Sequence, residues 1–374
     1  MKKILIVFGT RPEAIKMAPL VKQFGADNTF DVKVCVTAQH RHMLDQVLDF
    51  FEIQPDYDLD LMKPQQDLFQ LSANVLTGLK PVLEDFKPDY VFVHGDTTTS
   101  SMAALAAFYA GAKVCHVEAG LRTFNKYSPF PEEMNRQLTG RIADIHFAPT
   151  ESSCKNLMQE GVDRSAIVIT GNTVIDALYL TMEKLKSYED NQIIQLRKIL
   201  DPERKTILVT GHRRENFGEG FTNICLALKD IATDPDVQII FPVHLNPNVS
   251  GPVYRILDNI NNIHLIEPLS YPAFTWLMSR AYLIITDSGG VQEEAPGLGK
   301  PVLVMRDTTE RPEAVAAGTV RLVGASRERI VEEARKLLTD PVSYDAMSHA
   351  NNPYGDGLAA ERIVNFLAGK YSTV

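Results

Sequence analysis

The feature that most constrains the fold is the regular alternation of short apolar runs with amphipathic stretches. The apolar runs are rich in β-branched residues and do not alternate with polar ones, so we expect strands buried on both faces. Such strands, separated by helices, are typical of doubly wound α/β folds with parallel sheets. The expected strands are 4–8, 32–37, 90–94, 113–117, 145–148 and 167–170, and then 206–209, 237–241, 263–266, 282–285, 302–305 and 320–323.

These strands form two series, and a chain of 374 residues suggests about two domains. A charge-rich helical segment at 174–200 separates the series, so we place a first α/β domain at 1–172 and a second at 173–357. The final stretch, 358–374, contains an amphipathic pattern that predicts a helix. We expect this helix to cross back and join the first domain.

Composition excludes several classes of protein. The net charge of −9 argues against nucleic-acid binding, which needs a basic surface. No apolar run approaches the roughly 18 residues of a membrane span, and the N-terminal apolar run is too short for a signal peptide. The four cysteines lack metal-ligand or redox spacing. We therefore expect a cytoplasmic protein with reduced core cysteines and no membrane or nucleic-acid partner.

A glycine-rich turn joins an expected strand to an expected helix at residues 286–294. Ser288, Gly289 and Gly290 allow close approach to free backbone N–H groups at the helix start, which is a favourable place for phosphate. Glu294 falls about one turn into the helix, where its carboxylate could accept from a ribose diol. A tight turn followed by an acidic first helical turn explains the same residues equally well.

Polar residues also follow the strands of the first half. Asp96 follows the strand at 90–94, Glu118 follows the strand at 113–117, and Glu132 starts the next helix. An ionisable group at the end of a buried strand needs a partner or a ligand, so these three are acid/base candidates. For the neighbouring Glu133 we prefer a solvated helix start.

The second half offers cationic residues at the corresponding strand ends. His212 and Arg213 follow the strand at 206–209 and suit an anionic group, and His212 could protonate or stabilise a leaving phosphate. Arg-Pro-Glu-Ala occurs twice, beginning at Arg11 and at Arg311. Each copy can start a helix with Pro and Glu, and each places an arginine where open α/β sheets bind ligands.

Several cofactor motifs are absent. There is no Gly-x-Gly-x-x-Gly after the first strand, no Walker motif, no metal-ligand spacing and no Gly-x-Ser-x-Gly elbow. We therefore expect neither NAD nor a metal. The residues alone predict a two-domain enzyme with a central cleft, acting on a nucleotide diphosphate ligand, and they do not name the substrate.

Seven motifs in order resemble the non-hydrolysing UDP-N-acetylglucosamine 2-epimerases, along the whole chain. They are Gly-Thr-Arg-Pro-Glu-Ala-Ile-Lys at 9–16, Val-His-Gly-Asp-Thr at 93–97, His-Val-Glu-Ala-Gly-Leu-Arg at 116–122, Pro-Glu-Glu at 131–133, Thr-Gly-His-Arg-Arg-Glu at 210–215, Asp-Ser-Gly-Gly at 287–290 and Arg-Pro-Glu at 311–313.

The resemblance implies two Rossmann-like domains in the GT-B arrangement and a homodimer. It also implies reversible conversion of UDP-GlcNAc into UDP-ManNAc for bacterial surface polysaccharide synthesis. The proton on sugar carbon 2 is not acidic, so the resemblance implies a route through anti elimination of UDP, which gives 2-acetamidoglucal. UDP is then re-added to 2-acetamidoglucal by syn addition. This route needs no NAD.

The residues that match the family's motifs take on roles by resemblance. Asp96, Glu118 and Glu132 become acid/base groups, and His212 supports the leaving UDP. The resemblance assigns UDP binding, including the ribose and uracil, to Arg11, Lys16, Ser288, Gly289, Gly290, Arg311, Glu294 and Phe274.

Some relatives bind a second UDP-GlcNAc as an activator, and Gln39, Arg213 and His244 lie in the matching motifs. The sequence departs from the family pattern at His42, at residues 64–66 and at Leu269, where relatives can carry Gln beside the uracil. Other interpretations remain open: a GT-B glycosyltransferase, a hydrolysing epimerase, or a nucleotide-sugar sensor that would not need the three carboxylates.

Overall fold

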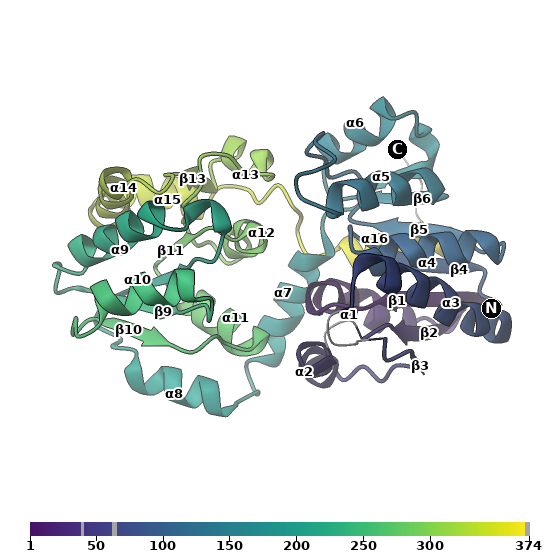
Figure 1. The fold of residues 1–374 in the computed structure, drawn as a ribbon, viewed down its shortest axis with the longest axis horizontal. Helices are drawn as coiled ribbons and strands as arrows, with labels where there is room; N and C mark the ends of the chain where they lie inside the picture. The colour runs from purple at the N-terminus through teal and green to yellow at the C-terminus, as the bar shows by residue number, and fades with distance from the viewer. Residues whose placement is uncertain (39–40, 62–65, 371–374) are drawn as a thin grey trace. The chain divides into compact units, whose positions relative to one another are not determined.

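The chain divides into two compact units in the computed structural model (Figure 1). Unit 1 comprises Met1–Leu180 and Tyr354–Val374, and unit 2 comprises Thr181–Pro353. The division falls inside helix α7 (Thr173–Lys184), later than the boundary placed at 172/173. The residues that the structure describes are 1–38, 41–61 and 66–370, without the side chain of His42.

Unit 1 contains a seven-stranded parallel sheet in the order β3-β2-β1-β4-β5-β6-β7. Its first two strands in the chain are paired in register from Lys2↔Phe30 to Phe8↔Val36. β3 was not expected from the sequence, because two residues carry no apolar pattern. The strands are β1 (Lys2–Phe8), β2 (Phe30–Val36), β3 (Tyr57–Asp58), β4 (Tyr90–His94), β5 (Lys113–Val117), β6 (Ile145–Ala148) and β7 (Ile167–Ile169).

Unit 2 contains a six-stranded parallel sheet in the order β10-β9-β8-β11-β12-β13. Both sheets are therefore doubly wound, and the predicted fold class is confirmed. Its strands are β8 (Lys205–Thr210), β9 (Val237–Pro242), β10 (Ile263–Ile266), β11 (Leu283–Thr286), β12 (Val302–Val304) and β13 (Val320–Leu322).

Helices connect consecutive strands, as parallel pairing requires. Those of unit 1 are α1 (Arg11–Gly25), α2 (Arg41–Phe51), α3 (Leu68–Phe86), α4 (Thr98–Tyr109), α5 (Glu132–Ile142), α6 (Glu151–Gln159), η1 (Arg164–Ala166), most of α7, and α16 (Ala359–Leu367). Those of unit 2 are α8 (Asn191–Ile199), η2 (Arg214–Asn216), α9 (Glu219–Ile231), α10 (Pro247–Leu257), α11 (Tyr271–Arg280), α12 (Gly289–Gly297), α13 (Pro312–Ala316), α14 (Arg327–Thr339) and α15 (Pro341–Ser348). None of the helices in the described part of the chain is long and apolar enough to span a bilayer.

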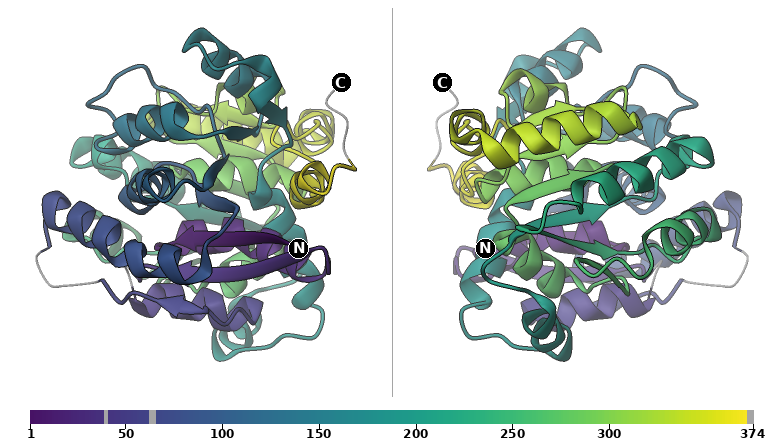
Figure 2. Two further views of the ribbon diagram at one scale, coloured as in Figure 1. Left: turned by 90° about the vertical axis from the view of Figure 1, so that its right-hand side faces the viewer. Right: turned by 90° about the vertical axis from the view of Figure 1, so that its left-hand side faces the viewer.

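Both faces of each sheet are buried, which explains the unalternating strand sequences. In β4, Val91 packs with α3 and α4, while the next residue, Phe92, lies on the opposite face. There its ring meets Phe24 of α1 at 5.2 Å and Phe147 at 6.0 Å. In unit 2, helices α9, α10 and α14 share one apolar core with the strands (Figure 2, right).

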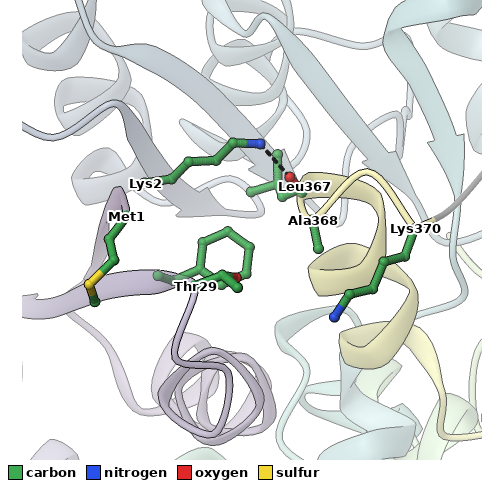
Figure 3. A pocket seen from close by; sticks show the side chains of 7 residues that line it. Met1, Lys2, Thr29, Leu367, Ala368 and Lys370 are labelled. Carbon is green, nitrogen blue, oxygen red and sulfur yellow. Dashed lines mark hydrogen bonds between the residues drawn. The ribbon is translucent and has the colours of Figure 1, made fainter.

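The returning C-terminal segment completes unit 1. α16 begins where the backbone N–H groups of Ala359 and Ala360 donate to the Asp176 carboxylate at 3.2 and 2.8 Å. Its far end lies beside the first strand (Figure 2, left). There Lys2 Nζ donates to the carbonyl of Leu367 at 2.5 Å (Figure 3). The Phe366 ring packs edge-on against Phe147 at 5.9 Å.

The four cysteines are buried and free, as expected for thiols of a reduced core. Burial raises the pKa of Cys35 and of Cys225 to about 12. Their thiols are therefore protonated at neutral pH and serve as small apolar residues.

Candidate functional site

In each sheet the strand order reverses at one pair of strands, β1 and β4 in unit 1 and β8 and β11 in unit 2. Doubly wound folds bind ligands outside the carboxyl ends of the strands at such a point. In unit 1, Arg11 follows β1 and Asp96 follows β4. In unit 2, His212 follows β8 and Ser288 follows β11. Four of the sequence-predicted residues thus follow the strands at the two switch points.

Glu118 follows β5 directly and has an unusual backbone conformation. Its φ of 61° lies in the left-handed region, which is costly for a residue other than glycine and is frequent at functional sites. The side chain is 7% exposed and forms an ion pair with Lys16 of α1. Asn172 Nδ2 donates to the same oxygen, Oε2, at 2.7 Å, and His94 Nε2 lies 3.9 Å from it.

His94 is a neutral neighbour of Glu118. Burial lowers its pKa to about 4, although the negative charge of Glu118 opposes the shift. Lys16 is therefore the cation beside Glu118 at neutral pH, and the pair is a buried ion pair with an additional amide donor.

Asp96 is held from helix α5. Arg136 donates to Asp96 Oδ2 through Nε at 2.9 Å and approaches the same oxygen with Nη2 at 2.7 Å. Asn135 Nδ2 donates to the Asp96 carbonyl at 2.9 Å. The Asp96 side chain remains about a quarter exposed, so a ligand can reach it while the guanidinium fixes its orientation.

Glu133 corrects one prediction from sequence: it is fully buried and not a solvated helix start. Its carboxylate accepts from the backbone N–H groups of Thr123 and Phe124 at 3.0 and 3.2 Å, from Arg136 Nη1 at 3.1 Å and from Gln137 Nε2 at 3.2 Å. Burial alone would raise the pKa of Glu133, but these hydrogen bonds outweigh it and hold the pKa below its ordinary value. Glu133 ties the loop after β5 to α5.

Glu132 is the first residue of α5 and differs from Glu133 in its contacts. Its Oε2 atom is buried and has no hydrogen-bond partner among the described residues. Because Asn135 and Arg136 of the same helix contact Asp96, the first turn of α5 adjoins the Asp96 turn. A buried carboxylate oxygen without a partner is costly unless a ligand or a proton occupies it.

Glu13 connects the two turns of the unit 1 switch point, a role that its sequence position did not reveal. It accepts from the backbone N–H of Gly9 at 3.0 Å and of Thr10 at 2.8 Å, in a capping box with Thr10. Thr97, the N-cap residue of α4, and Ser100, in its first turn, donate to the other Glu13 oxygen at 2.6 and 2.9 Å. The β1–α1 and β4–α4 turns, which carry Arg11 and Asp96, are thereby joined.

In unit 2, Asp287 organises the β8 turn. Its fully buried Oδ2 accepts from the backbone N–H groups of His212 and Arg213 at 2.9 and 2.8 Å. Its Oδ1 lies 3.3 Å from His212 Nδ1. Burial lowers the pKa of His212, opposed by the negative charge of Asp287, and the His212 ring stacks on His244 at 5.7 Å. Asp287 was part of the motif but was not predicted as a site residue.

The glycine-rich turn begins α12, as its sequence indicated. Ser288 is the N-cap residue, and its side chain makes no capping hydrogen bond. A side chain at Gly289 would place its Cβ 3.0 Å from Glu310 Oε1, so the Glu310 side chain would have to shift by a few tenths of an ångström. The helix start presents backbone N–H groups in the geometry that binds phosphate.

Charged side chains surround this helix start. Arg213 Nη2 lies 3.1 Å from Glu310 Oε1, Arg306 donates to Glu310 Oε2 at 2.5 Å, and Arg311 pairs with Glu293 of α12. Burial opposes ionisation of Glu310, but Arg311 and Arg306 outweigh it and lower its pKa to about 2. Arg311 is therefore held against α12, close to the turn it was predicted to serve.

The other predicted residues of unit 2 lie on neighbouring elements. Glu294, on α12, accepts from Tyr271 Oη of α11 at 3.1 Å. Phe274 is on the first turns of α11, and Leu269 precedes that helix, both half-buried. His244 Nδ1 accepts from the backbone N–H of Asn246 at 3.1 Å. Gln39, also predicted for an activator site, and residues 64 and 65 lie outside the described residues.

Two further observations concern other kinds of site. Within the described part of the chain, no three His, Cys, Asp or Glu side chains are grouped to hold a metal ion. A surface pocket of about 350 Å³ lies at the opposite, amino edge of the unit 1 sheet, lined by Lys2, Thr29 and Leu367 among others (Figure 3). It contains none of the predicted site residues.

The chain matches the family model described as UDP-N-acetylglucosamine 2-epimerase over residues 22–368. It is 61% identical over 368 residues to the UDP-N-acetylglucosamine 2-epimerase of Escherichia coli K12, covering 98% of each chain.

Solved structures agree with this match. A UDP-GlcNAc 2-epimerase from Neisseria meningitidis, bound to UDP-GlcNAc, superimposes with a TM-score of 0.90 at 54% identity, covering 98% of this chain and 100% of that one. MnaA of S. aureus in a co-structure with UDP gives a TM-score of 0.88 at 44% identity, covering 100% and 98%.

Proposed function

This chain belongs to the UDP-N-acetylglucosamine 2-epimerase family, whose members are isomerases, and we propose that it interconverts UDP-GlcNAc and UDP-ManNAc by elimination and re-addition of UDP. The observation that carries the mechanism is the division of chemistry between two switch points. Unit 1 supplies Asp96, Glu118 and Glu132, and unit 2 supplies a helix N-terminus flanked by His212 and arginines.

The carboxylates of unit 1 suit the proton transfers. A carboxylate removes the proton from sugar carbon 2 while the bond from carbon 1 to the diphosphate oxygen breaks, and its electrons leave with UDP. The product is 2-acetamidoglucal, with a double bond between carbons 1 and 2. A second acid delivers a proton to the other face of carbon 2 as UDP re-adds at carbon 1. Such positioned groups contribute roughly 10²- to 10⁴-fold each.

Two of these carboxylates have fixed orientations that support this role. Arg136 orients Asp96, and Lys16 with Asn172 orients Glu118. Glu132 brings a buried oxygen without a partner among the described residues, as expected of a group that waits for substrate. Opposed acid and base groups are needed because inversion requires proton transfer on both faces of one carbon.

The α12 turn suits the leaving group. Negative charge accumulates on the diphosphate as the carbon 1–oxygen bond breaks. The N–H groups after Ser288 can stabilise this charge by donating hydrogen bonds, without reorganisation of the protein. His212, fixed by Asp287, can share a proton with the departing phosphate. Holding UDP in place also prevents its loss while it is detached from the sugar.

Two accompanying proposals rest on the family resemblance: the protein forms a homodimer, and it binds a second UDP-GlcNAc through Gln39, Arg213 and His244. We also propose, from its composition, that it works in the cytoplasm. Sedimentation equilibrium tests the dimer. Sigmoidal initial rates against UDP-GlcNAc concentration, abolished by His244→Ala, would support the activator site.

The reaction is tested by incubating the protein with UDP-GlcNAc alone in deuterated water and following it by NMR. We expect UDP-ManNAc with deuterium at carbon 2 and little free UDP. Stoichiometric release of UDP and free ManNAc would instead identify a hydrolysing enzyme. Absence of any conversion without a sugar acceptor would favour a glycosyltransferase.

The division of roles is tested by Asp96→Asn, Glu118→Gln and Glu132→Gln. Each should lower kcat by about 100-fold or more and leave the Kd for UDP within about threefold, because most of the residues predicted to bind UDP lie in unit 2 and none of them is substituted. Equal loss of UDP affinity in all three variants would contradict this assignment.

A further inference from the structure

The side chain of Asn172 has a fixed orientation beside Glu118. Its Oδ1 accepts from the backbone N–H of Val174 at 3.2 Å at the start of α7. The opposite side of the amide must then be the N–H₂ group, and this group donates to Glu118 Oε2 at 2.7 Å. Asn172 is 2% exposed, so water cannot replace it easily.

Asn172 also contacts the segment through which the chain returns to unit 1. Its backbone N–H donates to the carbonyl of Tyr354 at 2.7 Å, and Tyr354 is almost fully buried. The adjacent backbones touch: a Cβ on Gly171 would lie 3.3 Å from the Cα of Gly355. Asn172 therefore joins the returning segment to Glu118, a predicted acid/base group.

Glu118 needs such support because its backbone is strained. Its φ of 61° directs the side chain differently from a residue with the extended backbone of a strand. Two donors, Lys16 Nζ and Asn172 Nδ2, reach the same oxygen. A cation and an amide on one oxygen fix both the charge and the rotation of the carboxylate.

We propose that Asn172 is a positioning residue for Glu118, which holds the carboxylate in its reactive orientation and ties that orientation to the returning segment at Tyr354. The proposal rests on the proposed function and deepens it. Asn172 itself touches no substrate atom in this scheme. A displaced carboxylate would slow proton transfer at carbon 2, since shifts of about 1 Å in a reacting group cost roughly 100-fold.

The first test compares Asn172→Ala and Asn172→Asp with the wild-type protein. Both should lower kcat by about 10- to 100-fold, with KM and the Kd for UDP within about threefold. Asn172→Asp keeps the shape and the acceptor for Val174 but places a carboxyl group against Glu118. It therefore serves as the second variant if Asn172→Ala folds poorly.

The second readout is the pH dependence of kcat/KM. Loss of a hydrogen bond to the charged carboxylate raises its pKa, and an introduced like charge raises it further. The acidic limb should therefore shift to higher pH, more in Asn172→Asp than in Asn172→Ala. The titratable groups that face Glu118 include Lys16 from α1 and His94 from β4, with Asp96 and His116 beside His94. The substitutions leave these four unchanged.

Asp176→Asn is the matched control. Asp176 binds the same returning segment through Ala359 and Ala360 and makes no described contact with Glu118. The Asp176→Asn substitution should lower the melting temperature without shifting the acidic limb of the kcat/KM profile. The proposal is overturned if the Asn172 variants keep kcat within about twofold, or if Asp176→Asn moves the acidic limb equally. Failure of the wild-type protein to form UDP-ManNAc would overturn the proposed function instead.

Discussion

Glu132 and Glu133 are adjacent, yet the structure predicts opposite consequences for the same Glu→Gln substitution. Glu133 is fully buried and accepts four hydrogen bonds, one of them from a buried arginine. Glu132 has a buried oxygen without a partner among the described residues. Glu133→Gln should therefore lower stability, and Glu132→Gln should lower activity.

The loss of unfolding free energy expected for Glu133→Gln follows from the hydrogen-bond partners of Glu133. Removing one member of a buried ion pair costs about 3–5 kcal/mol. Asp96 still pairs with Arg136 in this variant, so we expect a loss of about 2–3 kcal/mol for Glu133→Gln. For a unit of this size each kcal/mol lowers the melting temperature by about 2–4 °C, which gives a decrease of about 4–12 °C. Glu132→Gln should change the melting temperature by less than about 2 °C.

The assay is thermal unfolding by circular dichroism, combined with initial rates from the NMR assay well below the melting temperature. Glu132→Gln should lose about 100-fold or more in kcat. Glu133→Gln should keep much more activity at low temperature, because its effect on the reaction passes through Arg136 and Asp96. The reasoning is refuted if Glu133→Gln unfolds within about 1 °C of the wild type, or if Glu132→Gln is the less stable variant.

Three other predictions follow from individual sites. Gly120→Ala should destabilise by about 1–3 kcal/mol in urea unfolding, because its Cβ would lie 2.2 Å from the Ser153 carbonyl oxygen, whereas Gly251→Ala, on an open helix surface, should be neutral or slightly stabilising. The four cysteines should react with a thiol reagent only on unfolding, and rapid labelling of the native protein would contradict their burial. Burial lowers the pKa of His212, and the negative charge of UDP should raise it, so UDP binding near pH 6.5 should take up protons in calorimetry with buffers of different ionisation enthalpy. His212→Asn should remove this uptake, and an unchanged uptake would exclude His212 as its source.

The sequence predicted the sheets well because buried parallel strands have a local signature. Each expected run became a strand, with ends shifted by a few residues. β3 escaped detection because Tyr57–Asp58 is too short to show a pattern. The segment expected as helical at 174–200 is two helices. The second begins at Asn191, after the N-cap residue Asp190, whose side chain accepts from the backbone N–H of Ile193 at 2.8 Å.

The site was harder to predict because its supporting contacts are not local in sequence. Glu13 was interpreted as a helix-start residue, but its partners Thr97 and Ser100 come from another strand end. Asn172 lies 54 residues from Glu118, and no spacing rule relates them. The resemblance supplied roles for the carboxylates, while the residues that orient them became visible only in the folded chain.

The position of α16 has a consequence for how the protein is made. Unit 1 is built from both ends of the described chain, with all of unit 2 between them. Unit 2 is one continuous stretch with its own core, whereas unit 1 cannot be completed until residues 354–370 have been synthesised. Until then the apolar surface around Phe147 that Phe366 covers stays exposed to solvent and to chaperones. A chain truncated after Pro353 would contain all of unit 2 but an unfinished unit 1.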